Sequence, residues 1–174
     1  MGVDGHGRSW RGSAVVLLIA AALILRPWEH SLPMAGDEPR SARALVTRVV
    51  DGDTIEVELN GEREDVRYIG VDTPETVKPD TPVQCFGPQA SAFNHALMEG
   101  GRVRLVFGVE RRDVYGRLLA YVYLDNRFVN AALVRRGLAR TLTIPPNDRF
   151  AERFKGLEMR AARVGRGLWG ACDS

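Results

Sequence analysis

The sequence predicts an α+β protein: a small five-stranded Greek-key β-barrel with three helices, preceded by a hydrophobic N-terminal leader. Three observations carry this prediction. Turn signals cut the first half of the folded part into short strands, helical patterns begin only after the third strand, and an apolar run precedes both. Hairpins rather than helical crossovers join the early strands, which favours an antiparallel barrel over an open parallel sheet.

The N-terminal part is expected to lie outside the fold. Its apolar run from Ala14 to Leu25 has twelve residues, whereas a membrane-spanning helix needs about 20. Basic residues before the run are typical of a signal peptide, but Trp10 and Trp28 bracket it as interfacial anchors would. We therefore expect residues 1–28 to be a cleaved signal peptide or an uncleaved membrane anchor, and residues 29–43 to be a linker. Both alternatives place the domain outside the cytoplasm, secreted or anchored.

The folded domain is expected to span residues 44–174, beginning with a three-stranded meander. Asp51-Gly52 is a hairpin signal, and Asn60-Gly61 is the strongest short hairpin signal of all. The three strands that these turns delimit are Ala44–Val50, Asp53–Leu59 and a third that ends at Val71.

Helices and two more strands follow. Pro88 suits the first turn of a helix, and Asn130 can cap the start of another. The expected elements are a helix from Gly87 to Gly100, strands Val103–Phe107 and Leu118–Leu124, a short helix from Asn130 to Gly137, and a last helix from about Asn147. The last helix should bury one apolar face, made of Phe150, Phe154, Leu157, Ala161 and Val164.

Composition excludes several classes of site. The formal net charge is +2, so attraction to phosphate must come from local placement rather than from a strongly basic surface overall. Of the three histidines, only His95 lies in the folded part, on an expected helix. A histidine-based nuclease, a zinc cluster and a Ser-His-Asp triad are therefore not expected.

One stretch changes from apolar strand to charged loop within a few residues. Arg67 lies inside the third strand, Asp72 follows its end, and Thr73-Pro74 stiffens the turn that presents Glu75. A cation, two carboxylates and a rigid turn suit a metal and a phosphate. The alternative is an ordinary surface ion pair.

Two further clusters belong with this stretch. Asp53 alone is an ordinary turn acid, but if the second and third strands pair, it lies beside Asp72 and can share a hard cation with it. The segment Arg111–Arg117 alone is a solvated loop. Tyr115-Gly116 predicts a turn that aims Arg117, with the aromatic ring free to pack on a sugar or base.

Together these clusters resemble a known family. The matching motifs are Asp51 to Thr54, Arg67 to Glu75, Phe86-Gly87-Pro88 with Ala90 to Phe93, Asp113 to Tyr121, and Val129 to Ala139. From about Ala44 to Trp169 the chain resembles the staphylococcal nuclease (thermonuclease) family. The resemblance implies an OB-fold barrel with three helices, and a calcium-dependent nuclease that cuts the 5′ oxygen to phosphorus bond of DNA and RNA and leaves 3′-phosphates.

The resemblance also implies roles for single residues. It assigns calcium to the carboxylates of Asp53 and Asp72 and the carbonyl of Thr73, catalysis to Arg67, Glu75 and Arg117, and nucleotide contacts to Tyr115 and the same two arginines. Val114, Thr143 and Pro145 depart from the family pattern, which bears on nucleotide affinity. We expect a monomer whose partners are DNA and RNA, single strands preferred, and a membrane if the leader stays uncleaved.

The chemistry of phosphodiester hydrolysis supports these roles independently. The transition state gains negative charge on the phosphate, which two guanidiniums can hold bidentately. Glu75 can align or deprotonate the attacking water. Arg117 stays protonated, so it stabilises charge rather than donating a proton.

Two alternatives remain open. Cys85 and Cys172 are expected to form a disulfide in an exported chain, the alternative being two buried thiols. In place of a nuclease, the domain could be a non-catalytic nucleic-acid-binding barrel or a module that binds protein or glycan at the cell envelope. The intact charged residues argue against both.

Overall fold

The computed structural model describes residues 1–2, 40–76 and 80–172. The described residues from 40 to 172 belong to one compact unit. The expected leader and most of the expected linker lie outside the described residues. No helix in the described part combines the length and the apolar character that crossing a membrane requires.

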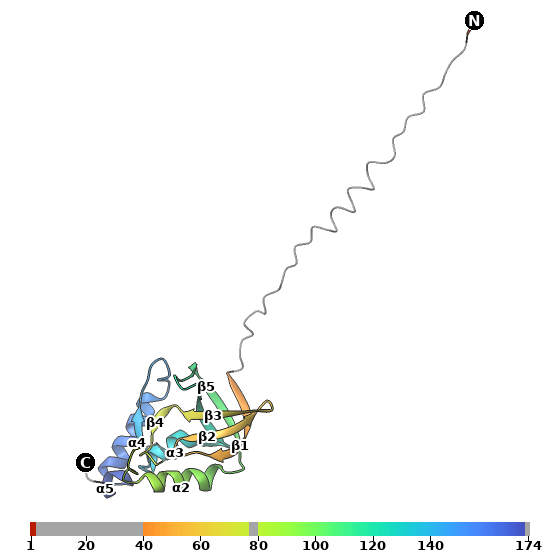
Figure 1. Ribbon diagram of the computed structural model, residues 1–174. Coiled ribbons are helices and arrows are strands. Elements are labelled where there is room, and N and C mark those ends of the chain that lie inside the picture. Colours follow the sequence, from red (N-terminus) through yellow and green to blue (C-terminus); the bar gives the residue numbers. More distant parts are fainter. Residues whose placement is uncertain (3–39, 77–79, 173–174) are drawn as a thin grey trace. The chain divides into compact units, whose positions relative to one another are not determined.

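Five strands form the closed barrel that the sequence predicts, and the OB-fold is confirmed (Figure 1). They are β1 (Ser41–Val49), β2 (Thr54–Leu59), β3 (Glu62–Tyr68), β5 (Arg102–Arg112) and β6 (Leu118–Leu124). Their order is β3-β2-β1-β5-β6, and a parallel pairing between β3 and β6 closes the barrel. Strand β1 begins three residues before the expected domain start at residue 44, because Ser41 to Arg43 pair with β5.

The third strand is shorter than expected. It ends at Tyr68, and the chain continues as β4 (Gly70–Asp72), which pairs with β8 (Arg140–Leu142) in a separate ribbon. Gly70 has φ +80°, and a Cβ there would lie 2.5 Å from the ring of Phe154. The break therefore depends on glycine, and it turns the chain out of the barrel just before Asp72.

Three helices flank the barrel as expected: α2 (Gly87–Met98), α3 (Val129–Arg135) and α4 (Ala151–Arg163). A single turn, α5 (Leu168–Ala171), and a two-residue strand, β7 (Arg127–Phe128), were not expected. Helix α4 buries Phe154 and Ala161, but Val164 follows its end and is exposed, so its place on the apolar face was wrongly predicted.

Helix α4 also begins later than expected. Asn147 is buried and its amide bonds the backbone of Glu110 in β5, accepting at 3.1 Å from the nitrogen and donating at 2.8 Å to the oxygen. Gly108 leaves the room for this side chain, because a Cβ there would lie within 2.6 Å of the amide group. Asn147 therefore fastens the loop after β8 to the barrel instead of starting the helix.

Asn130 is not a helix cap, which corrects the expectation. It lies inside α3, fully buried, and the residue that precedes the helix is Phe128. Its side chain accepts a hydrogen bond from the nitrogen of Val122 at 2.9 Å and donates one to the carbonyl of Ile69 at 2.9 Å. One amide thus joins α3 to β6 and to the break between β3 and β4.

Replacing Asn130 by alanine should lower the free energy of unfolding by about 2 to 3 kcal/mol, because two buried backbone groups lose their partners. Urea denaturation followed by circular dichroism measures this. Asn126→Ala, at an exposed turn position, is the matched control and should cost less than about 0.5 kcal/mol. Equal effects of the two substitutions would show that the Asn130 bonds contribute nothing particular to the fold.

Candidate active site

Asp53 lies in the turn before β2, which packs closely against Thr73. Asp51 accepts a hydrogen bond from the Asp53 nitrogen at 2.9 Å, which shapes the turn. A Cβ on Gly52 would lie 2.7 Å from the hydroxyl oxygen of Thr73, so only glycine lets Thr73 approach. From α2, the fully buried Asn94 donates to the Asp51 carbonyl at 2.8 Å. Gly52 is therefore a packing requirement of the site as well as part of a turn.

Asp53 is a nearly buried carboxylate, 4% exposed. Its Oδ2 accepts hydrogen bonds from the nitrogen and the hydroxyl of Thr73, at 2.7 and 2.9 Å. Burial raises its pKa, while the guanidinium of Arg67 and the two Thr73 bonds act in the opposite direction. A carboxylate in this setting favours a cation beside it.

The guanidinium of Arg67 lies between the carboxylates of Asp53 and Asp72. Its Nη1 lies 3.0 Å from Oδ2 of Asp53, and its Nη2 lies 2.8 Å from Oδ1 of Asp72. Nη1 also donates to the carbonyl of Val71 at 2.8 Å. The guanidinium, from β3, therefore bonds the turn before β2 and both residues at the end of β4. The pairing of β2 with β3 places Thr54, next to Asp53, opposite Arg67. Asp72 was expected at the end of that third strand but lies at the end of β4 in the separate ribbon, so Arg67 joins the two acids rather than the strand pairing.

The loop that carries Glu75 is held by its surroundings. Its nitrogen donates to the side chain of Gln84 at 3.0 Å, and its carbonyl accepts from the Gln84 nitrogen at 2.9 Å. A Cβ on Gly87 would lie 3.0 Å from the carbonyls of Pro74 and Glu75, so the start of α2 packs closely against this loop. The Glu75 carboxylate accepts from the nitrogen of Thr76 at 2.8 Å.

Cys85 and Cys172 form the disulfide that the sequence predicts, with a sequence separation of 87 residues. Cys85 follows Gln84 directly and precedes the start of α2, and Cys172 follows α5. The bond therefore ties the end of the Glu75 loop to the C-terminal segment.

The third cluster is a loop that fixes Arg117. Both carboxylate oxygens of Asp113 are used: Oδ1 accepts from the nitrogens of Tyr115 and Arg117 at 3.0 Å, and Oδ2 from Nε of Arg117 at 2.7 Å. Arg112 makes a bidentate ion pair with Glu64 of β3, at 2.6 and 2.9 Å. The loop is therefore fastened to the same strand that carries Arg67.

One cleft gathers all these side chains, and its volume is about 530 Å³. Every residue expected in the site lines it, namely Asp53, Arg67, Asp72, Thr73, Glu75, Tyr115 and Arg117. Asp51 and Asp65 line it as well. The three sequence clusters are thus brought together in space, although they are up to 64 residues apart (117 minus 53).

An apolar pocket of about 300 Å³ adjoins the cleft and shares Arg67, Tyr115 and Arg117 with it. Its walls include Leu142 and Ile144, which the sequence analysis missed. Of the three departures from the family pattern, Val114 lines the pocket, whereas Thr143 and Pro145 do not.

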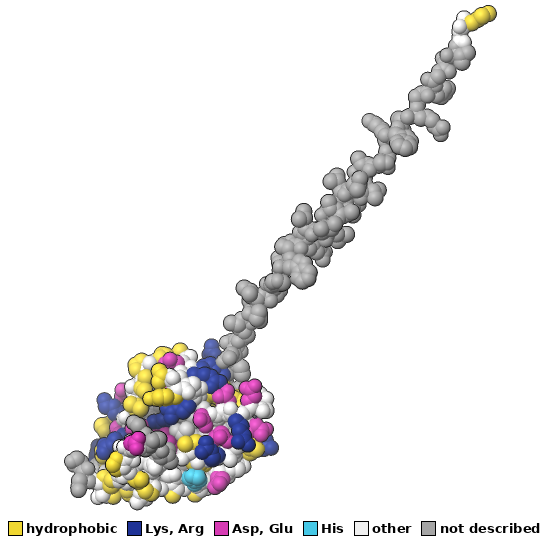
Figure 2. Space-filling view, viewed as in Figure 1, with side chains coloured by type: hydrophobic (Ala, Val, Ile, Leu, Met, Phe, Trp, Pro, Cys, Tyr) yellow, Lys and Arg dark blue, Asp and Glu magenta, His cyan; other side chains and the backbone are white. Residues whose placement is uncertain are grey.

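Exposed apolar side chains gather around this pocket. In Figure 2, hydrophobic side chains crowd the end of the folded unit where Figure 1 shows the β5–β6 loop and the segment after β8. Val114 and Tyr115 are 94% and 80% exposed there. Exposed apolar groups beside guanidiniums suit a ligand with a flat ring and a phosphate.

The donors in the cleft fit a hard cation in kind. Carboxylate and carbonyl oxygens are calcium's preferred ligands, and it takes roughly six to eight of them. Asp53, Asp72 and the carbonyl of Thr73 supply fewer, so water or substrate oxygens would have to complete the set. Among the described residues, no group of three or more His, Cys, Asp or Glu side chains is arranged to hold a metal ion.

Similarity to known proteins agrees with this geometry. A family model described as Staphylococcal nuclease homologue matches residues 65–171. Thermonuclease of Staphylococcus intermedius is 41% identical over 162 residues, which are 88% of the chain and 95% of that protein. The chain belongs to the staphylococcal nuclease family.

Two more members of the family are similar over most of the chain. Thermonuclease of Staphylococcus hyicus is 44% identical over 124 residues, 71% of the chain and 73% of that protein. Endonuclease YncB of Bacillus subtilis is 40% identical over 139 residues, 79% of the chain and 66% of that protein. The family resemblance found in the sequence motifs is thus confirmed.

Sequence reasoning did not predict how Gln84, Gly87 and Asp113 hold the site, although Gly87 and Asp113 lie in the motifs of the family resemblance. None of the three is placed to contact a ligand: Asp113 holds Arg117, whereas Gln84 and Gly87 hold the loop of Glu75. Only Asp113 carried a sequence signal, since an acid four residues before an arginine across a tight turn can pair with it. Gln84 and Gly87 contact Pro74 and Glu75, nine to thirteen residues earlier, in a loop whose course no sequence signal predicts.

Removing the disulfide with Cys85→Ser and Cys172→Ser should lower the free energy of unfolding by roughly 4 kcal/mol, as expected for closing a long loop. Limited proteolysis should also cut faster between Glu75 and Cys85. The measurements are thermal denaturation and peptide mapping with and without reductant. A reductant should affect the wild type and leave the double variant unchanged, and identical melting of oxidised and reduced wild type would contradict the prediction.

Proposed function

We propose that this chain is a calcium-dependent nuclease that hydrolyses phosphodiester bonds of DNA and RNA at the 5′ oxygen and leaves 3′-phosphates. One observation carries the proposal: two guanidiniums, a glutamate and the oxygen donors for a cation line a single cleft. Relatives named thermonuclease and endonuclease support it.

Arg67 and Arg117 are proposed to hold the phosphate. They approach the cleft from β3 and from the end of the β5–β6 loop, so their forks can bond two different oxygens. Asp113 positions Arg117 by occupying its Nε and Nη2, the latter also at 2.7 Å. The negative charge that develops on the phosphate would therefore meet donors that are already oriented.

Glu75 is proposed to align the attacking water or to take its proton. It lies on a loop that Gln84 and the start of α2 hold in place. When bound, calcium would neutralise phosphate charge and lower the pKa of a coordinated water. Asp53, Asp72 and Thr73 are the residues proposed to hold it.

The apolar pocket is proposed to take the base next to the scissile phosphate. Tyr115 offers a ring for stacking, and Leu142 and Ile144 offer apolar walls. Such walls imply no base-specific hydrogen bonding, which suits the proposed activity on both DNA and RNA. A single strand presents its bases to such a pocket without unpairing, so single strands should be preferred.

An extracytoplasmic location is proposed, either secreted or anchored by the leader. The disulfide supports it, because such bonds persist in oxidising compartments. The described domain is proposed to act as a monomer.

Substitution of the proposed catalytic residues should lower cleavage strongly, and circular dichroism checks that each variant is folded, above all Arg67→Ala, which leaves the buried Asp53 without its guanidinium. Arg67→Ala, Glu75→Ala and Arg117→Ala should each lower kcat/KM on single-stranded DNA by about 100-fold or more. The matched control is Asp65→Asn, an exposed acid in the same cleft, which should keep most of the activity. Full activity of Glu75→Ala would remove Glu75 from the mechanism. Wild-type protein that binds the strand but never cuts it would favour the non-catalytic alternative.

Chelation should stop cleavage, and calcium should restore it. Full-length protein is assayed on single-stranded DNA and RNA with EGTA and then with added calcium, while circular dichroism confirms that the fold persists. Asp72→Asn should raise the calcium concentration needed for half-maximal activity, because an exposed ligand charge is lost without a change in shape. Activity that resists the chelator would overturn the metal assignment.

A further inference from the structure

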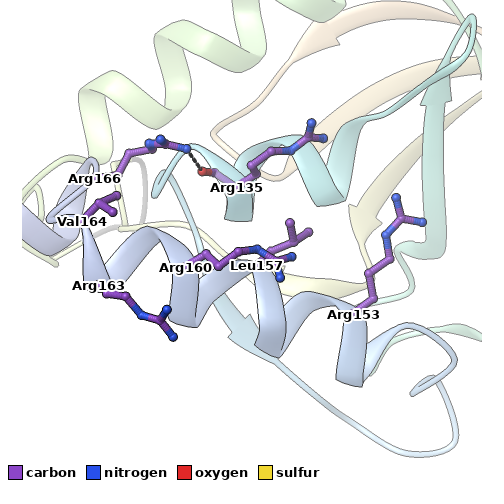
Figure 3. A pocket seen from close by; sticks show the side chains of 7 residues that line it. All are labelled: Arg135, Arg153, Leu157, Arg160, Arg163, Val164 and Arg166. Atoms are coloured by element: carbon purple, nitrogen blue, oxygen red, sulfur yellow. Dashed lines mark hydrogen bonds between the residues drawn. The ribbon is translucent and has the colours of Figure 1, made fainter.

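A groove lined by arginines lies between α3 and α4, outside the cleft. Its volume is about 620 Å³, and its lining is Arg135, Arg153, Leu157, Arg160, Arg163, Val164 and Arg166. None of these residues lines the catalytic cleft. In Figure 3, Arg135 of α3 and Arg153 of α4 extend to the same side, and Arg166 reaches back to α3.

A second hollow of about 470 Å³ continues this groove. It shares Arg135 and Arg166 with the first and adds Arg127 and Arg136, together with Phe93 and Ala132. We call the seven arginines that line the two hollows the arginine surface. All seven are exposed.

The charge of the arginine surface is not balanced by neighbouring acids. Among the described residues, none of its members forms an ion pair with a carboxylate, whereas Arg112 and Arg117 do. Its internal contacts are to neutral groups: Arg166 donates to the carbonyl of Arg135 at 3.1 Å, and Arg136 stacks over Phe93. Seven positive charges thus stand together in a chain whose formal net charge is +2.

We infer that the arginine surface binds the phosphate backbone of the polynucleotide at a stretch beyond the catalytic cleft. The inference rests on the proposed function, which makes a long polyanion the substrate. Like charges repel one another, and a bound anion relieves that repulsion. Guanidinium forks also match phosphate oxygens bidentately, which the ammonium group of lysine cannot do.

The arrangement suits a linear polyanion. Arg153 and Arg160 are seven residues apart on one face of α4, about 10 Å along the helix. Arg135 faces them from α3 across the groove. Repeated charges along a groove match a chain of phosphates better than a single small anion. A lipid bilayer is flat, so a groove between two helices follows it less closely than it follows a flexible strand.

The test measures binding without cleavage. Full-length protein carrying Glu75→Gln, with calcium present so that the cleft can also bind, is titrated with fluorescein-labelled single-stranded DNA of 40 nucleotides and of three. In this background, Arg153→Gln with Arg160→Gln should weaken binding of the long strand by about tenfold at low salt. The slope of log Kd against log salt should fall by about 1.4, since each single-strand phosphate contact contributes about 0.7. Binding of the three-nucleotide strand should not change.

The matched control removes two charges elsewhere. Lys155→Gln changes an exposed residue of α4 that lies outside both hollows, and Arg63→Gln changes an exposed residue of β3. This pair should leave the affinity and the salt slope for the long strand unchanged. Similar losses in both double variants would mean that only net charge matters, which would overturn the inference.

Failure of the inference can be told apart from failure of the proposed function. If the wild type cleaves DNA but the arginine variant keeps both its affinity and its salt slope, the inference alone is overturned. If the wild type does not cleave and the arginine variant still loses the predicted slope, the surface is supported and the nuclease is rejected. Binding to phosphatidylserine vesicles is measured in parallel. If the arginine variant keeps its affinity for the long strand and loses binding to the vesicles, the surface serves a membrane and the inference is overturned.

Discussion

The guanidinium of Arg67, bonded to two carboxylates, is the interaction on which the rest of the site depends. It joins the turn before β2, the end of β4 and its own strand β3. Asp53 is almost fully buried. Removing the Arg67 guanidinium would leave its charge uncompensated, which would lower the free energy of unfolding by about 3 to 5 kcal/mol. Stability of the barrel and geometry of the cleft are therefore coupled through one side chain.

Small residues and loop anchors then bring the other groups to Arg67. Because Gly52 has no side chain, Thr73 can approach Asp53, and because Gly87 has none, the Glu75 loop can pack against the start of α2. The bonds of Asp113 hold Arg117, and Arg112 fastens that loop to β3. Functional residues often lie on loops that a rigid scaffold positions, because the loops can vary in sequence while the scaffold stays the same.

The sequence predicted most of this architecture because its signals are local. Hairpin dipeptides and alternating strands gave the barrel, and the charged clusters at the strand ends gave the residues that line the cleft. Wrong or missed features depend on contacts between distant segments. Asn130 looked like a helix cap because a polar residue began the pattern. Only the positions of Val122 and Ile69 show that it bonds β6 and the break between β3 and β4 instead. Gly70, at the break, likewise cannot be replaced by a residue with a side chain, because Phe154 occupies that space.

Charge distribution explains why a second binding surface would matter to this protein. Five carboxylates line the cleft, those of Asp51, Asp53, Asp65, Asp72 and Glu75, against the guanidiniums of Arg67 and Arg117. Without a bound cation such a cleft repels a polyanion. Calcium would reduce that repulsion only locally, since an exposed charge is screened within about 10 Å at ordinary salt. The unpaired guanidiniums between α3 and α4 would attract the strand irrespective of the metal, so capture of the polymer and its cleavage would depend on two separate sets of charges.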